Sequence, residues 1–141
     1  MTRNHSIIIL LAVIPLFLGM GSLQGTSSPD KIPIPAKKYH AIFVDQADVI
    51  TECREASIEG ATFLEGKRGE GNFTISFENI EQVLFRQNEE QLTGIVKLHG
   101  GEVLELSLNK NQKGYGLTKY GTFQIKLSDL KKMTFEPSPK R

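Results

Sequence analysis

Hydrophobic and polar residues alternate along most of the chain between residues 39 and 136. Apolar side chains at every second position are typical of a β-strand with one buried face. The segment GIVKLHGGEVLELSL contains two such runs on either side of adjacent glycines. It predicts a β-hairpin with a three-residue connection, Gly100–Glu102. That connection would place Leu98 opposite Leu104 and Lys97 opposite Glu105, because the hydrophobic faces have to match.

A second pattern is an echo along the chain. GNFTISFENIEQVLF, Gly71 to Phe85, resembles GTFQIKLSDLKKMTF, Gly121 to Phe135, at an offset of 50 residues. Eight of the fifteen positions are chemically similar, which indicates an internal repeat. The repeat units are expected at residues 41–90 and 91–136. Either unit alone is too short to bury a comfortable core, so one fused body is expected.

Each copy of the echo predicts a strand, one tight turn and another strand. In the first copy Phe73, Ile75 and Phe77 alternate as buried residues should, and Val83 to Phe85 begins the next strand. Asn79, like Asp129 in the second copy, is expected to cap the turn. A helix over residues 78–92 is the competing interpretation, and Pro137 argues against it in the second copy. The element resembles the closing part of small SH3-like and Sm-like barrels, and the resemblance covers only that element.

Prolines define the limits of the predicted domain. Pro29, Pro33 and Pro35 lie in a polar linker, residues 26–38, and Pro137 and Pro139 lie in a short tail, residues 137–141. Residues 39–136 are therefore expected to form one all-β domain of eight to ten strands. The expected architecture is a small pseudo-symmetric β-sandwich or partly open barrel built from the two repeats.

The N-terminus has the pattern of a secretory signal peptide. A short basic start precedes the uncharged run Ser6 to Met20, and small residues follow that run. Residues 1–25 are expected to direct export to the periplasm or the extracellular space. An uncleaved N-terminal anchor is the alternative, and it is the one case in which we expect membrane contact.

Charge is distributed unevenly along the chain. Residues 45–90 hold eleven acidic and four basic residues, whereas residues 91–141 hold four acidic and nine basic residues. These opposite charges could pack one repeat on the other, or drive self-association or partner binding between molecules. Candidate partner-binding residues are the charges that differ between the copies: Lys126, Lys131, Lys132, Glu78 and Glu81. Lys131 and Lys132 are also expected to protect a sheet edge.

Cys53 is the single cysteine, so an exported chain would contain no internal disulfide. A small buried apolar role is the simpler interpretation. An intermolecular thiol at Cys53 is the alternative.

Residues suited to catalysis or cofactor binding are sparse. His40 and His99 are the only histidines after the N-terminal segment, and no nucleophile, metal or haem motif accompanies them. No enzyme activity, cofactor or metal is therefore expected. The near-zero charge after residue 25 argues against nucleic-acid binding. The Gly-rich stretch Gly66–Asn72 is expected to be a hairpin loop, and Asn72 begins an N-glycosylation sequon.

Three functions fit these observations. The leading hypothesis is an exported, non-catalytic β-module of the bacterial envelope that binds a protein partner or self-associates. The alternatives are a ligand carrier or enzyme with a pocket between the repeats, and a membrane-tethered structural spacer.

Overall fold

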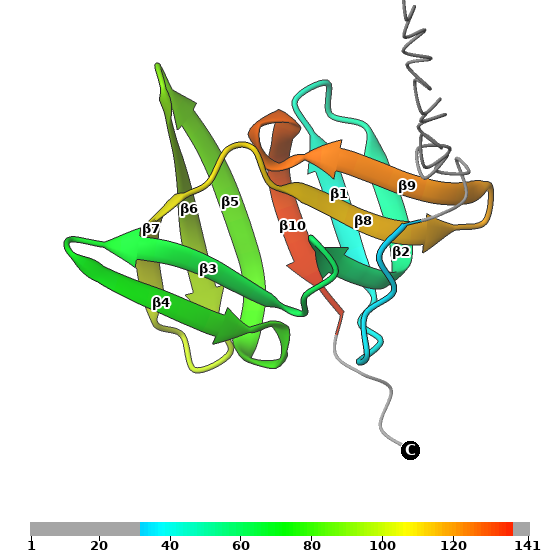
Figure 1. Ribbon diagram of the computed structural model, residues 1–141, viewed down its shortest axis with the longest axis horizontal. Coiled ribbons are helices and arrows are strands. Elements are labelled where there is room, and N and C mark those ends of the chain that lie inside the picture. The colour runs from blue at the N-terminus through cyan, green and yellow to red at the C-terminus, as the bar shows by residue number, and fades with distance from the viewer. Residues whose placement is uncertain (1–31, 137–141) are drawn as a thin grey trace, which may run out of the picture.

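The computed structural model describes residues 32–136, which form ten antiparallel β-strands and two single 3₁₀ turns (Figure 1). The signal peptide expected at residues 1–25 and the tail lie outside the described residues. The strands are β1 (Ala41–Asp45), β2 (Ile50–Ile58), β3 (Phe63–Arg68), β4 (Gly71–Ser76), β5 (Ile80–Asn88), β6 (Gln91–Leu98), β7 (Val103–Leu108), β8 (Lys113–Thr118), β9 (Gly121–Lys126) and β10 (Leu130–Phe135). The turns are η1 (Phe77–Asn79) and η2 (Leu127–Asp129). The all-β class and the strand–turn–strand elements are confirmed.

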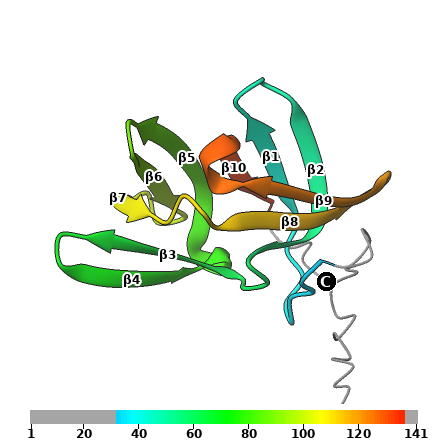
Figure 2. The same ribbon diagram turned by 45° about the horizontal axis from the view of Figure 1, so that its top comes forward.

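All ten strands belong to one sheet in the order β4-β3-β7-β6-β5-β10-β1-β2-β8-β9. The sheet curls at both ends, and Figures 1 and 2 show its two curled halves side by side. We call β4-β3-β7-β6-β5 the first half-barrel and β10-β1-β2-β8-β9 the second half-barrel. The first is continuous in sequence, residues 63–108, whereas the second joins strands from both ends of the domain. Each half-barrel therefore contains strands from both predicted repeat units.

The order of the strands is symmetric about the β5–β10 pair. Val83 and Met133, which lie 50 residues apart, pair with each other at the centre of the sheet. Both side chains are fully buried. They belong to one continuous core with Ile80, Leu130, Phe85 and Phe135, among others.

Corresponding positions are separated by two offsets. The strands β3 to β5 match β8 to β10 at an offset of 50 residues, and the hairpin β1–β2 matches β6–β7 at an offset of 53. The hairpin loops agree with the second offset, since Asp48 (φ 63°) and Gly101 (φ 95°) occupy the same left-handed position. Backbone bonds agree as well: the amide of Gln46 donates to Asp129, and the amide of His99 donates to Asn79.

Two glycines mark the same close approach in each half-barrel. A Cβ atom at Gly66 would lie 2.8 Å from the Cβ of Leu106, and one at Gly116 would lie 2.5 Å from the Cβ of Cys53. Strands β3 and β8 therefore cross their neighbours at a distance that excludes a side chain at these points. This contact explains why both copies have glycine there.

The predicted register of the β6–β7 hairpin is wrong by two residues. Val96 pairs with Leu104 and Lys97 pairs with Val103, because the loop consists of residues 99–101. Gly101 takes the left-handed conformation that the third residue of such a loop requires. The faces remain as predicted, since a shift of two residues keeps each side chain on its side.

Two further local predictions are wrong. Asn79 is the last residue of η1, and Ser76 provides the cap by accepting a hydrogen bond from the amide of Glu78. Lys131 and Lys132 do not protect a sheet edge, because β10 lies in the middle of the sheet between β5 and β1. The edge strands are β4 and β9.

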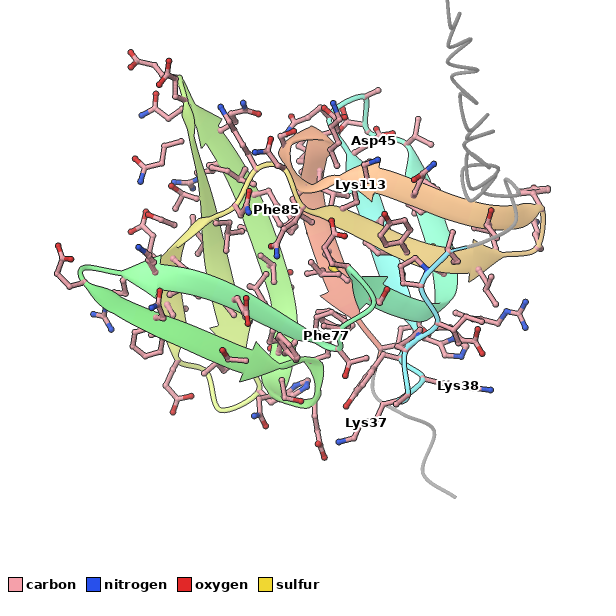
Figure 3. All side chains as sticks on the ribbon, in the orientation of Figure 1. Lys37, Lys38, Asp45, Phe77, Phe85 and Lys113 are labelled. Carbon is pink, nitrogen blue, oxygen red and sulfur yellow. The ribbon has the colours of Figure 1, made fainter. Side chains whose placement is uncertain are left out.

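Aromatic side chains fill the junction of the two half-barrels. Phe77 lies where they meet (Figure 3), with its ring centroid 4.4 Å from that of Phe135 and 5.7 Å from that of Tyr39. Phe77 is 1% exposed. It therefore joins η1 to β10 and to the segment that precedes β1.

Candidate functional site

The two half-barrels differ at one place, and the difference in offset locates it. The offset is 53 residues up to Glu55 and its counterpart Leu108, and it is 50 residues from Glu59 onward. Residues 56–58 therefore have no counterpart in the first half-barrel. In the second half-barrel these three residues are buried and extend β2 along β8, where Ser57 pairs with Tyr115.

The missing segment leaves a gap between β3 and β7. These strands pair only at Lys67 and Ser107, whereas β2 and β8 pair at three positions. A groove of about 570 Å³ opens beside this single pair. Its lining is formed by Glu65, Gly66, Lys67, Asn72, Phe73, Thr74, Ser107, Leu108, Asn109 and Gln112. The gap is thus a structural consequence of three absent residues.

Backbone groups of β3 face this gap. The carbonyl of Thr62 accepts a bond from Phe77 on the β4 side, and successive residues of a strand direct their backbone groups to opposite sides. The amide and carbonyl groups of Phe63, Glu65 and Lys67 therefore face β7. Lys67 meets Ser107 there, but no strand of the described chain pairs with Phe63 or Glu65 on that side.

Phe73 provides apolar surface at the gap. The sequence predicted a buried side chain, and this is wrong, because Phe73 is 39% exposed. Its counterpart Phe123 packs on Phe43, with the ring centroids 5.5 Å apart. The residue that corresponds to Phe43 is Val96, which is too short to cover Phe73. The first half-barrel therefore has an open mouth where the second is closed.

A basic hollow continues the groove past the Lys67–Ser107 pair. It measures about 590 Å³ and includes Lys67, Arg68 and Arg86, with Glu105 as its one carboxylate. The described chain has three salt bridges, and none of them involves these three cations. The cations are therefore available to an anionic group, although they lie in the half-barrel with more acidic than basic residues.

The structure does not bring the predicted partner-binding residues together. Lys131 pairs with Asp48 at 2.6 Å, and Glu81 lies 3.5 Å from Lys97. In each pair the partner belongs to the hairpin from the other repeat unit.

The remaining predicted residues are separated from these pairs and from one another. Lys132 lies in the central strand β10, whereas Lys126 ends the edge strand β9 and Glu78 is exposed in η1. The strand exchange thus neutralises much of the charge difference. The first half-barrel has eight acidic and four basic residues, and the second has five acidic and six basic residues.

Cys53 is a buried core residue with 3% of its surface exposed. An intermolecular disulfide at Cys53 is therefore not accessible to the folded chain, which corrects the alternative considered from the sequence. Burial raises the pKa of the thiol from 9.0 to about 12.

The Cys53 thiol gives a testable pH dependence. Because its pKa is higher in the folded state, the free energy of unfolding should be constant below about pH 9 and should fall as pH rises toward 12, by up to about 1 kcal/mol per pH unit. At pH 8 a thiol reagent should label the folded chain at least about a hundredfold more slowly than the urea-unfolded chain. Urea titrations at several pH values and a labelling time course would measure both. Cys53→Ala should flatten the alkaline decline, and rapid labelling of the native chain would contradict the assignment.

The groove suits binding by hydrogen bonds and packing. Its ten lining residues include no histidine or cysteine. Over residues 32–136, no three His, Cys, Asp or Glu side chains lie close enough together to hold a metal ion. His40 precedes β1 and His99 lies in the β6–β7 loop, so the two histidines belong to separate segments. Within the same range, no helix has the length and apolar character needed to cross a membrane.

The fold and the groove together define a class of protein. It is an all-β protein built from one ten-stranded antiparallel sheet, curled into two half-barrels, with a strand-sized gap in one of them. Residues 35–138 match a family model described as "Uncharacterised protein", and the chain belongs to that family. No curated protein and no solved structure matches the chain.

Sequence reasoning did not find the groove residues. The informative signal was a second offset: Ile50 and Val103, and Glu52 and Glu105, correspond at 53 residues. A single offset of 50 for the whole chain conceals the three-residue difference that creates the gap.

Proposed function

We propose that this chain is an exported, non-catalytic β-module that binds a partner protein through the groove between β3 and β7. The observation that supports the proposal most directly is the gap itself, where the second half-barrel has three buried residues and the first has none. A groove with apolar surface, a few polar side chains and free strand backbone is typical of protein recognition.

Export rests on the pattern of residues 1–25 in the sequence. Self-association through charge is less favoured, because Glu81 and Lys131 form salt bridges within the chain. The neighbouring cations Lys67, Arg68 and Arg86 form none, which favours the groove as the contact surface.

A photo-crosslinking experiment tests this proposal. A photoreactive amino acid replaces Asn109, an exposed residue that lines the groove, and the cells are irradiated. The matched control places the same amino acid at Lys119, in the exposed turn between β8 and β9. We expect an adduct of defined added mass from position 109 that is absent from position 119.

The mass of the adduct separates the hypotheses. An added mass that differs from that of the chain supports a partner protein, and an added mass equal to that of the chain indicates self-association. Equal labelling at both positions, or no adduct at position 109, would contradict a binding site in the groove.

A further inference from the structure

The second half-barrel shows what fits the gap, because it contains the segment that the first lacks. Residues 56–58 are Ala, Ser and Ile, with exposures of 0%, 0% and 4%. All three therefore lie within packed surroundings, which require small side chains at the first two positions. The Ser57 hydroxyl has no hydrogen-bond partner within the described chain, so the position requires small size and not a hydroxyl group.

The backbone of this segment has a defined orientation. The amide of Ala56 donates to Tyr39 and the amide of Ile58 donates to Ala61, both away from β8. The backbone groups of Ser57 therefore face β8, where Ser57 pairs with Tyr115. The residue that corresponds to Tyr115 in the first half-barrel is Glu65, whose backbone faces the open gap.

The basic hollow adds a charge requirement at one end of the gap. A segment that lies beside β3 as residues 56–58 lie beside β8 has its N-terminal end at Ser107, the counterpart of Arg54. Residues that precede it would leave the gap next to Lys67, Arg68 and Arg86. A carboxylate there would interact favourably with cations that have no salt-bridge partner within the described chain.

We infer that the groove binds an extended segment of the partner protein, which adds as a short strand beside β3. The segment has two small residues followed by a β-branched one, and it is preceded by an acidic residue. This inference rests on the proposed function and specifies the mode of binding. The backbone groups of Glu65 provide the hydrogen bonds, and Phe73 and Leu108 provide the apolar contacts.

The probe for this inference is the capped peptide Glu-Ala-Ser-Ile-Glu, the sequence of residues 55–59. Titration into the ¹⁵N-labelled chain should shift the amide signals of Phe63, Glu65 and Phe73 in a saturable manner. N-methylation of the serine amide removes the group that faces β3, so it should weaken binding at least tenfold. N-methylation of the alanine amide, which faces away, should change binding by less than about threefold. Replacing the first glutamate by glutamine should weaken binding about threefold or more, and this effect should disappear at high salt.

A variant of the protein provides the matched control. Inserting Ala-Ser-Ile after Leu108 gives the first half-barrel the residues that the second half-barrel has, and should abolish peptide binding while the chain stays folded. The same insertion after Lys119, in the turn between β8 and β9, should leave binding unchanged. Should either insertion unfold the chain, the two N-methylated peptides still decide the question.

Several results would overturn the inference. These are no saturable shift up to millimolar peptide, shifts away from β3, or equal losses from the two N-methylations. Dimerisation of the chain through the gap would also overturn it, because the occupant would then be a second copy. A position-109 adduct without peptide binding would leave the proposed function standing and reject only this mode of recognition.

Discussion

Replacing Phe77 by alanine is expected to lower the free energy of unfolding by about 3–5 kcal/mol, the usual range for a buried phenylalanine. Phe77 is 1% exposed and its ring contacts both Phe135 and Tyr39. The loss would therefore affect η1, the last strand and the segment before the first strand together. Urea unfolding followed by far-ultraviolet circular dichroism would measure it.

Phe63 provides the matched control. It is also a phenylalanine of the first half-barrel, but it is 37% exposed. Phe63→Ala should cost no more than about 1 kcal/mol. Equal losses from Phe77→Ala and Phe63→Ala would show that Phe77 does not have the central position that the structure gives it.

Gly116→Ala should also be strongly destabilising, by about 2–3 kcal/mol, which is the upper part of the range for overpacked cores. The added Cβ would lie 2.5 Å from the Cβ of Cys53 and 2.8 Å from its Sγ atom. Strand β8 cannot move away without breaking its pairing with β2. The measurement is the same urea titration.

Gly71 offers a comparison in a similar hairpin. A Cβ atom at Gly71 would meet its nearest neighbour, the carbonyl oxygen of Arg68, at an ordinary distance of 3.6 Å. Gly71→Ala should therefore change stability by no more than about 1 kcal/mol. The double variant Gly116→Ala with Cys53→Gly removes the clashing Cβ atom and should recover part of the Gly116→Ala loss relative to Cys53→Gly alone. Full additivity of the two changes would argue against the close approach.

The alternation of apolar residues was sufficient to predict strands and their faces. Val83, Phe85, Leu106 and Leu108 are buried as the period of two requires. The same pattern does not determine which strands become neighbours, because every half-buried strand has the same alternation. The exchange of the hairpins between half-barrels therefore could not be predicted, and Lys132 was assigned to an edge when it lies in the centre of the sheet.

The candidate site depends on differences that are smaller still. Phe73 and Phe123 are identical in the sequence, and only the size of the residue that faces each of them decides which is covered. The gap beside Glu65 depends on three residues in a strand–turn connection. Such a difference becomes visible when the pairing of each strand is known.

The β1–β10 pair has a consequence for how the chain folds. Ala41 pairs with Phe135, so the second half-barrel closes only when segments more than ninety residues apart in the sequence meet. The first half-barrel, by contrast, uses neighbouring strands. Contacts between distant segments slow folding because the intervening chain has to be ordered first. During synthesis, β1 and β2 must therefore wait for the last strand, and the nascent chain remains incompletely folded until its end has emerged.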